Sequence, residues 1–152
     1  KGICQTAQNA PSNACSPMYR FNGEELNLTE KEWKERLSPE QFRILRKNKS
    51  EPAFHNEYYD WTEPGIYHCA GCNLPLFCSD SKYDSKAGWP TFSQPICSEN
   101  VFLERTWNPF SKKREVLCSR CEGHLGYIFS DSSSPTGKRY RINSAALKFV
   151  EQ

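Results

Sequence analysis

The chain has 152 residues, and its 20 basic and 18 acidic side chains leave a net charge of +2. Because the two signs nearly balance, nothing in the charge favours nucleic acid as a partner, and no apolar stretch approaches membrane-spanning length. The length predicts one domain with a real core, here residues 21–152, preceded by an N-terminal extension over 1–20. Since the first residue is Lys1, we expect processing from a longer chain.

Two short helices are predicted after the extension. The segment Thr29-Glu-Lys-Glu32 has the pattern of a capping box, and Ser38-Pro39 places a second N-cap before a proline at the first helical position. The second helix is expected to end near Asn48. Apolar residues lie on one side of these helices, which we interpret as packing elements: Trp33, Leu37, Phe42, Ile44 and Leu45.

From Gly65 onward the pattern changes to short strands separated by Gly, Pro, Asn, Asp and Ser. Helices followed by strands predict an α+β fold, mainly β, with an antiparallel sheet curled into a small barrel. The expected strands are Ile66–Cys69, Leu76–Phe77, Val101–Leu103, Glu115–Leu117, Tyr127–Phe129, Arg139–Ile142 and Leu147–Phe149.

Two Cys-x-x-Cys pairs predict one metal site. Cys69 and Cys72 form the first pair, and Cys118 and Cys121 form the second. Each pair places two sulfurs on a tight turn, and four thiolates complete the tetrahedral shell of a structural zinc ion with no position open for substrate. Two disulfides or a redox Cys-x-x-Cys are the alternative, and a tetrathiolate iron site would have the same spacing.

The other four cysteines are Cys4, Cys15, Cys78 and Cys97. Of the three complete pairings, we favour Cys4 with Cys15, across a polar segment, and Cys78 with Cys97. Disulfides and two glycosylation sequons, at Asn27 and Asn48, favour a secretory route. A cytosolic protein with reduced thiols is the open alternative.

Several phrases occur in a fixed order along the chain: Glu51-Pro-Ala-Phe-His-Asn-Glu-Tyr58, Tyr67-His-Cys-Ala-Gly-Cys72, Leu76-Phe77, Ser81-Lys-Tyr-Asp-Ser85, Gly88-Trp-Pro-Thr-Phe92, Cys118-Ser-Arg-Cys121, His124-Leu-Gly126 and Arg139-Tyr-Arg-Ile-Asn-Ser-Ala-Ala-Leu-Lys-Phe149. Together they resemble the methionine-R-sulfoxide reductase family (MsrB, or SelR). The resemblance covers nearly everything from about residue 22 to the end and implies the MsrB fold.

The resemblance also implies an activity. A cysteine or selenocysteine of the family attacks the sulfur of methionine-R-sulfoxide, a second thiol resolves the sulfenic acid, and thioredoxin recycles the enzyme. In this chain the nucleophile position is Arg141, the usual resolving position is Ala87, and one pocket histidine is replaced by Tyr127. A guanidinium stays protonated and cannot be oxidised and reduced again as a thiolate can.

Other pocket positions match the family. Trp89 corresponds to the aromatic that packs on the substrate methyl group, and His124 and Asn143 correspond to polar groups around the sulfoxide. The expected pocket therefore contains Trp89, His124, Tyr127, Arg139, Arg141 and Asn143. Phe92 and Phe129 are either pocket walls or core residues, and His55 and His68 match no catalytic position.

Three interpretations follow from these departures. The first is a catalytically silent, zinc-stabilised relative, in which Arg141 either binds a small anionic or methionine-like ligand or simply plugs the old site, for instance by pairing with Asp131. The second is an active reductase that uses Cys97 or Cys78. The third is an altered codon at position 141, with Cys4 or Cys15 resolving. The basic run Lys112–Arg114 is either a solvated hairpin tip or a binding patch.

Overall fold

The computed structural model describes residue 4 and residues 15–105, 110 and 113–152. The two predicted helices are α1, Glu30–Arg36, and α2, Pro39–Lys47, and each begins with a complete capping box. Thr29 accepts a hydrogen bond from the Glu32 amide, and Ser38 does the same for Gln41. These side-chain bonds satisfy amides that have no partner within the helix, so the helix starts follow from local sequence alone.

In the part of the chain that the structure describes, eight strands form two antiparallel sheets. Each predicted strand lies within an observed one, and the mainly β, α+β architecture is confirmed; only the two-residue strand β3 was not predicted. The sheet orders are β2-β1-β8 and β3-β7-β6-β5-β4. The bounds are β1 Gly65–Cys69, β2 Pro75–Cys78, β3 Thr91–Phe92, β4 Val101–Arg105, β5 Arg114–Cys118, β6 His124–Ser130, β7 Lys138–Ile142 and β8 Leu147–Glu151, with short 3-10 turns η1 Ser79–Ser81, η2 Ser98–Asn100 and η3 Ser144–Ala146.

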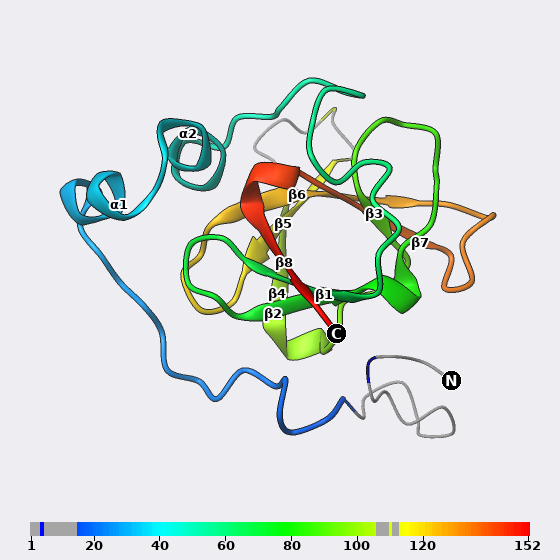
Figure 1. The fold of residues 1–152 in the computed structure, drawn as a ribbon, viewed down its shortest axis with the longest axis horizontal. Coiled ribbons are helices and arrows are strands. Elements are labelled where there is room, and N and C mark those ends of the chain that lie inside the picture. The colour runs from blue at the N-terminus through cyan, green and yellow to red at the C-terminus, as the bar shows by residue number, and fades with distance from the viewer. Residues whose placement is uncertain (1–3, 5–14, 106–109, 111–112) are drawn as a thin grey trace.

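The two sheets face each other around one core, so that the strands form a ring in the view of Figure 1. The two helices lie outside this ring, on one side of it. Tyr67 and Phe77 from the first sheet meet Phe92 from the second, with the Phe77 and Phe92 rings stacked 4.4 Å apart. Phe92 is fully buried, so it belongs to the core rather than to a pocket wall. Ile44 and Leu45 of α2 join the same cluster. No helix of the described residues combines the length and apolar character needed to cross a membrane.

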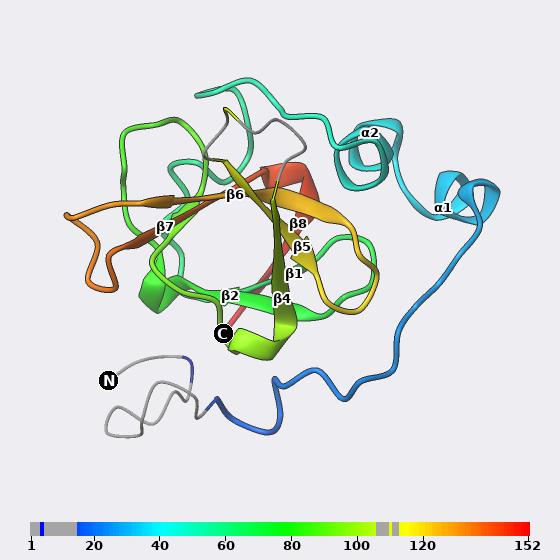
Figure 2. The same cartoon turned by 180° about the vertical axis from the view of Figure 1, so that it is seen from behind.

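The segment before α1 runs along the outside of the sheets (Figure 2). The buried side chain of Asn100 anchors it, because its amide donates to the carbonyls of Tyr19 and Pro75 and its oxygen accepts from the Phe21 amide. Two disulfides add covalent ties to this part of the chain.

Those disulfides join Cys4 to Cys78 and Cys15 to Cys97. The expected pairing of Cys4 with Cys15 and Cys78 with Cys97 is therefore wrong. The Cα atoms of the true pairs are 6.2 and 5.1 Å apart, because each extension cysteine docks against a different cysteine of the domain. Sequence proximity favoured the short loop, whereas tertiary docking decides the pairing.

Candidate functional site

The four cysteines of the two Cys-x-x-Cys pairs meet in one buried cluster. Their sulfur atoms all lie within 4.8 Å of one another, with Cys69 and Cys121 Sγ 3.7 Å apart and Cys72 and Cys118 Sγ 3.4 Å apart. A tetrahedral zinc with bonds of about 2.3 Å separates its sulfur ligands by roughly 3.8 Å. The cluster is therefore compatible with a structural zinc site, and it leaves no ligand position for a substrate.

The two knuckles have the same backbone geometry. One lies in the β1–β2 turn and the other in the β5–β6 turn. In each, the residue after the second cysteine is left-handed, with φ of 68° at Asn73 and 60° at Glu122, and donates its amide to the carbonyl of the first cysteine at 2.8 Å. His68 Nδ1 contacts the Asn73 carbonyl at 3.0 Å, so this histidine supports the first knuckle and is not a ligand.

Three arginines surround the cluster. Arg36 donates to the carbonyl of Gly71 at 2.7 Å, Arg46 to that of Cys121 at 2.7 Å, and Arg120 to that of Cys72 at 3.0 Å. Four thiolates around a divalent ion carry net negative charge, which nearby guanidinium groups stabilise. Arg36 and Arg46 come from the two helices, which were expected to be packing elements alone.

Arg141 lies on a separate face, formed by β6, β7 and the segment before β3. On β7, Arg139 and Arg141 alternate with Tyr140 and Ile142, so the arginines share one face while Tyr140 and Ile142 face the core. Across the ladder, Arg141 pairs with Tyr127 and Arg139 pairs with Phe129. The expected residues Trp89, Tyr127, Arg139 and Arg141 are thus brought together.

The Arg141 guanidinium is stacked among aromatic rings. Its central carbon lies 4.4 Å from the centroid of Trp89, 4.8 Å from Phe129 and 5.9 Å from Tyr127. Burial lowers the pKa of this group, and the neighbouring Arg139 lowers it further. Among the described residues no carboxylate forms an ion pair with Arg141, so the suggested pairing of Arg141 with Asp131 is wrong. The Asp131 carboxylate accepts hydrogen bonds from Tyr83 and Ser133 instead.

His124 is fully buried beside Tyr127, with ring centroids 5.2 Å apart. Its Nδ1 is 2.7 Å from a carboxylate oxygen of Glu115, and its Nε2 has no partner among the described residues. Burial lowers the pKa of His124 against the opposing effect of Glu115. A neutral ring that donates from Nδ1 fits both observations, and Glu115 is a pocket residue that sequence reasoning missed.

Asn143 serves the fold rather than this face. Its oxygen accepts from the Glu51 amide at 3.2 Å and its amide donates to the Leu125 carbonyl at 3.1 Å. Glu51 in turn accepts from the backbone amides of Ser144 and Ala145, while its carbonyl accepts from the Trp89 indole. This network holds Trp89 against Arg141.

Three other residues singled out in the sequence lie elsewhere or have other contacts. His55 is exposed, and Lys112 lies outside the described residues. The Nζ of Lys113 lies over the Tyr127 ring, 5.3 Å from its centroid.

Comparison with known proteins gives this geometry a family. A model described as the SelR domain matches residues 37–151. The peptide methionine sulfoxide reductase MsrB of Leptospira interrogans is 45% identical over 128 residues, covering 84% of this chain and 98% of that protein. The MsrB of Azotobacter vinelandii is 48% identical over 116 residues, covering 76% of this chain and 87% of that protein.

A plant relative and a solved structure were also found. The chloroplastic peptide methionine sulfoxide reductase B1 of Arabidopsis thaliana is 48% identical over 123 residues, covering 80% of this chain and 60% of that longer protein. The crystal structure of a Mis18 'Yippee-like' domain aligns with a TM-score of 0.48 at 19% identity, over 59% of this chain and 98% of that one, which is too distant to support an inference. The family match and the bacterial relatives together place this chain in the SelR (MsrB) family of peptide methionine sulfoxide reductases.

Proposed function

We propose that this protein is a catalytically silent member of its family, in which a zinc-stabilised domain is kept for binding or structure. The observation that carries the proposal is the packing of Arg141, whose guanidinium contacts the rings of Trp89 and Phe129. By the family resemblance, this residue stands at the position of the nucleophile. A guanidinium has no lone pair to attack sulfur and cannot pass through a sulfenic acid. Relatives are named as reductases, and by the family resemblance this chain has an arginine at the position of the nucleophilic cysteine.

The remaining thiols support the same proposal. Cys78 and Cys97, the alternative nucleophiles, are each less than 5% exposed and bonded to cysteines of the extension. The other four cysteines face one another in the metal cluster. Every cysteine of the chain is thus engaged, so an active reductase would first have to break a disulfide or lose its metal.

The state of the Arg141 face favours a plug over an open anion site. Its guanidinium is in contact with the rings of Trp89, Phe129 and Tyr127. By the family resemblance, Tyr127 and Ala87 stand at the positions of a histidine and the resolving thiol. A small anionic or methionine-like ligand that displaces Arg141 from its rings is the second candidate, supported by the positive charge of Arg139, Arg141 and Lys113 on one face.

Zinc in the cysteine cluster and a secretory location complete the proposal. Four buried thiolates at tetrahedral spacing favour zinc in a purely structural role. Two disulfides in so short a chain are typical of an oxidising compartment. Metal analysis of the purified protein tests for zinc. The secretory location is tested by looking for the protein in the medium of the cells that produce it, with its two disulfides checked by non-reducing mass spectrometry.

The function itself is tested by methionine-R-sulfoxide reduction with dithiothreitol as the recycling thiol. We compare the native chain with Arg141→Cys, with Arg141→Cys/Tyr127→His, and with Arg139→Cys as a matched control on the same strand face. We expect turnover only in the two variants that place a thiol at position 141, and more in the double variant because the histidine can protonate the leaving oxygen. Turnover by the native chain that Cys97→Ser or Cys78→Ser abolishes would establish the alternative reductase instead.

A further inference from the structure

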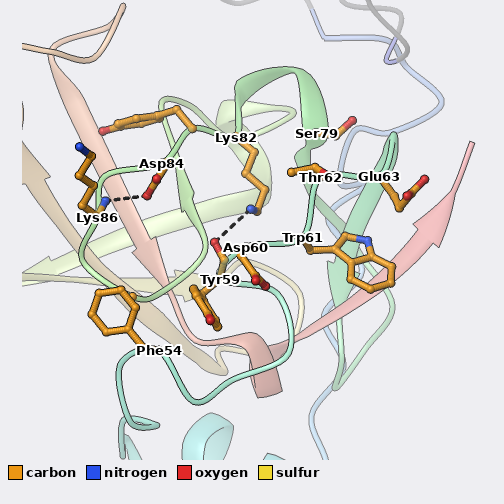
Figure 3. A pocket seen from close by; sticks show the side chains of 12 residues that line it. Phe54, Tyr59, Asp60, Trp61, Thr62, Glu63, Ser79, Lys82, Asp84 and Lys86 are labelled. Carbon is orange, nitrogen blue, oxygen red and sulfur yellow. Dashed lines mark hydrogen bonds between the residues drawn. The ribbon is translucent and has the colours of Figure 1, made fainter.

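A cavity lies apart from the Arg141 face. It is enclosed by the loop from Phe54 to Glu63, which precedes β1, and by the segment from Ser79 to Gly88, which precedes β3 (Figure 3). Its volume of about 560 Å³ is in the range of sites for small organic molecules. None of the aromatic or basic side chains around Arg141 lines it.

Aromatic rings form the walls of this cavity. Phe54 and Trp61 are 52% and 37% exposed, which makes them two of the four large hydrophobic residues that the described part of the chain leaves exposed. Each ring is supported from one side: Trp61 lies edge-on to Tyr58 and Phe149 at 6.0 and 5.6 Å, and Phe54 lies edge-on to Tyr59 at 5.7 Å. Supported and partly exposed rings that line a cavity are suited to an apolar ligand body.

The two loops that line the cavity contain strained backbone and are joined by hydrogen bonds at Gly88. Phe54 has a φ of 63° and Lys86 a φ of 60°, values that bulky side chains rarely adopt. The Gly88 carbonyl accepts from the Phe54 amide and from the Asn56 side chain, both at 2.8 Å. A Cβ at Gly88 would lie 2.7 Å from the Phe54 ring and amide, so only glycine permits this approach. Such strain is typical of functional sites and gives the cavity a preformed mouth.

Lys82 supplies a cation inside the cavity. Its side chain crosses toward the loop opposite (Figure 3), and its Nζ donates to the Tyr59 carbonyl at 3.4 Å. No carboxylate of the described residues lies within ion-pair distance of this ammonium, which has three donors to place. Burial lowers the pKa of Lys82 against the opposing effects of Asp60 and Asp84, which is consistent with an incompletely satisfied cation.

Carboxylates line the opening. Asp60, Glu63 and Asp84 are all exposed cavity-lining residues, and Lys86 is the one exposed cation with them. The site therefore offers one partly buried positive group and a more negative rim. The acidic rim would repel a ligand that carries only a negative charge, and Lys82 would repel a ligand that carries only a positive charge.

We propose that this cavity binds a small zwitterion with an apolar body, of the kind represented by a free aromatic α-amino acid. The ligand carboxylate accepts from Lys82, its ammonium faces Asp60, and its side chain packs against Trp61. The site is independent of the proposed loss of reductase chemistry, because neither its residues nor its ligand involves Arg141.

Isothermal titration calorimetry with L-phenylalanine on the full oxidised, metal-loaded chain tests this site. We expect saturable binding that weakens about tenfold or more in Lys82→Met, which keeps the aliphatic stem and removes the ammonium. Asp60→Asn weakens binding less, because its carboxylate is exposed to solvent. Lys138→Met, an exposed lysine on β7 away from the cavity, serves as the control and leaves binding unchanged.

The ligand can be varied in place of the protein, which keeps the test valid if Lys82→Met fails to fold. L-phenylalaninamide lacks the carboxylate and N-acetyl-L-phenylalanine lacks the ammonium, so each must bind more weakly than L-phenylalanine itself. The proposal is overturned by no saturable heat at about 10 mM ligand, by equal binding of all three compounds, or by unchanged affinity in Lys82→Met. Binding of a neutral methyl glucoside in place of L-phenylalanine would assign the cavity to another ligand class.

Discussion

Truncation of Arg141 measures how far this residue has become part of the packing. In Arg141→Ala the ring contacts at 4.4 and 4.8 Å are lost together with the half-buried aliphatic stem. A partly desolvated cation–π contact contributes roughly 0.5–2 kcal/mol, so two contacts and the stem together give an expected loss of about 2–3 kcal/mol in the free energy of unfolding. Arg141→Met keeps the stem and should lose about 1–2 kcal/mol.

The assay is urea unfolding of the oxidised, metal-loaded protein, followed by tryptophan fluorescence and by far-ultraviolet circular dichroism. Lys138→Ala removes an exposed cation from the same strand and should change stability by no more than about 0.5 kcal/mol. A double-mutant cycle with Trp89→Leu isolates the stacking energy, with an expected coupling of about 0.5–1.5 kcal/mol. A loss below about 0.5 kcal/mol in Arg141→Ala, or a coupling near zero, would refute the plug.

Three further predictions concern the metal, the buried histidine and the extension. Removal of the metal by a chelator under denaturant should unfold the domain, and Arg46→Met should speed metal loss relative to Arg43→Met, an exposed arginine on the same helix; equal rates would contradict a role for the guanidinium. His124 has a lowered pKa when folded, so the unfolded chain binds more protons and stability falls as pH drops below about 6.5. The loss between about pH 7.5 and pH 5, measured by urea unfolding, should be smaller in His124→Asn than in the native chain. Reduction of the two disulfides should release the extension and lower the unfolding free energy by at least about 2 kcal/mol, and an unchanged urea midpoint would argue against this tie.

Local signals in this sequence were sufficient for several elements. The capping boxes at Thr29 and Ser38 and the two cysteine knuckles depend on residues a few positions apart, and each occurs as expected. The two-residue strand β3 was missed, because it is too short to show alternation and is recognised by its pairing with β7.

Long-range features needed the structure. Pairing of Cys4 with Cys78 joins residues 74 positions apart, and nothing near either cysteine specifies the other. Asn143 was expected in the pocket, but its side-chain oxygen accepts from the Glu51 backbone amide and its side-chain nitrogen donates to the Leu125 carbonyl. The cavity around Lys82 was not predicted, since its walls come from two loops that have no shared motif and are joined by long-range contacts at the Gly88 carbonyl and at Lys82.

The central claim is that the Arg141 face performs no reduction, and a single-turnover experiment tests it most directly. The native oxidised protein, in molar excess over methionine-R-sulfoxide, is incubated without and then with dithiothreitol, and the methionine formed is counted per protein molecule. Even one attack by an unrecognised thiol is visible under these conditions, since recycling is not required. We expect no methionine above the protein-free reaction in either case. Formation of methionine in proportion to the protein added would show that the protein is a working reductase.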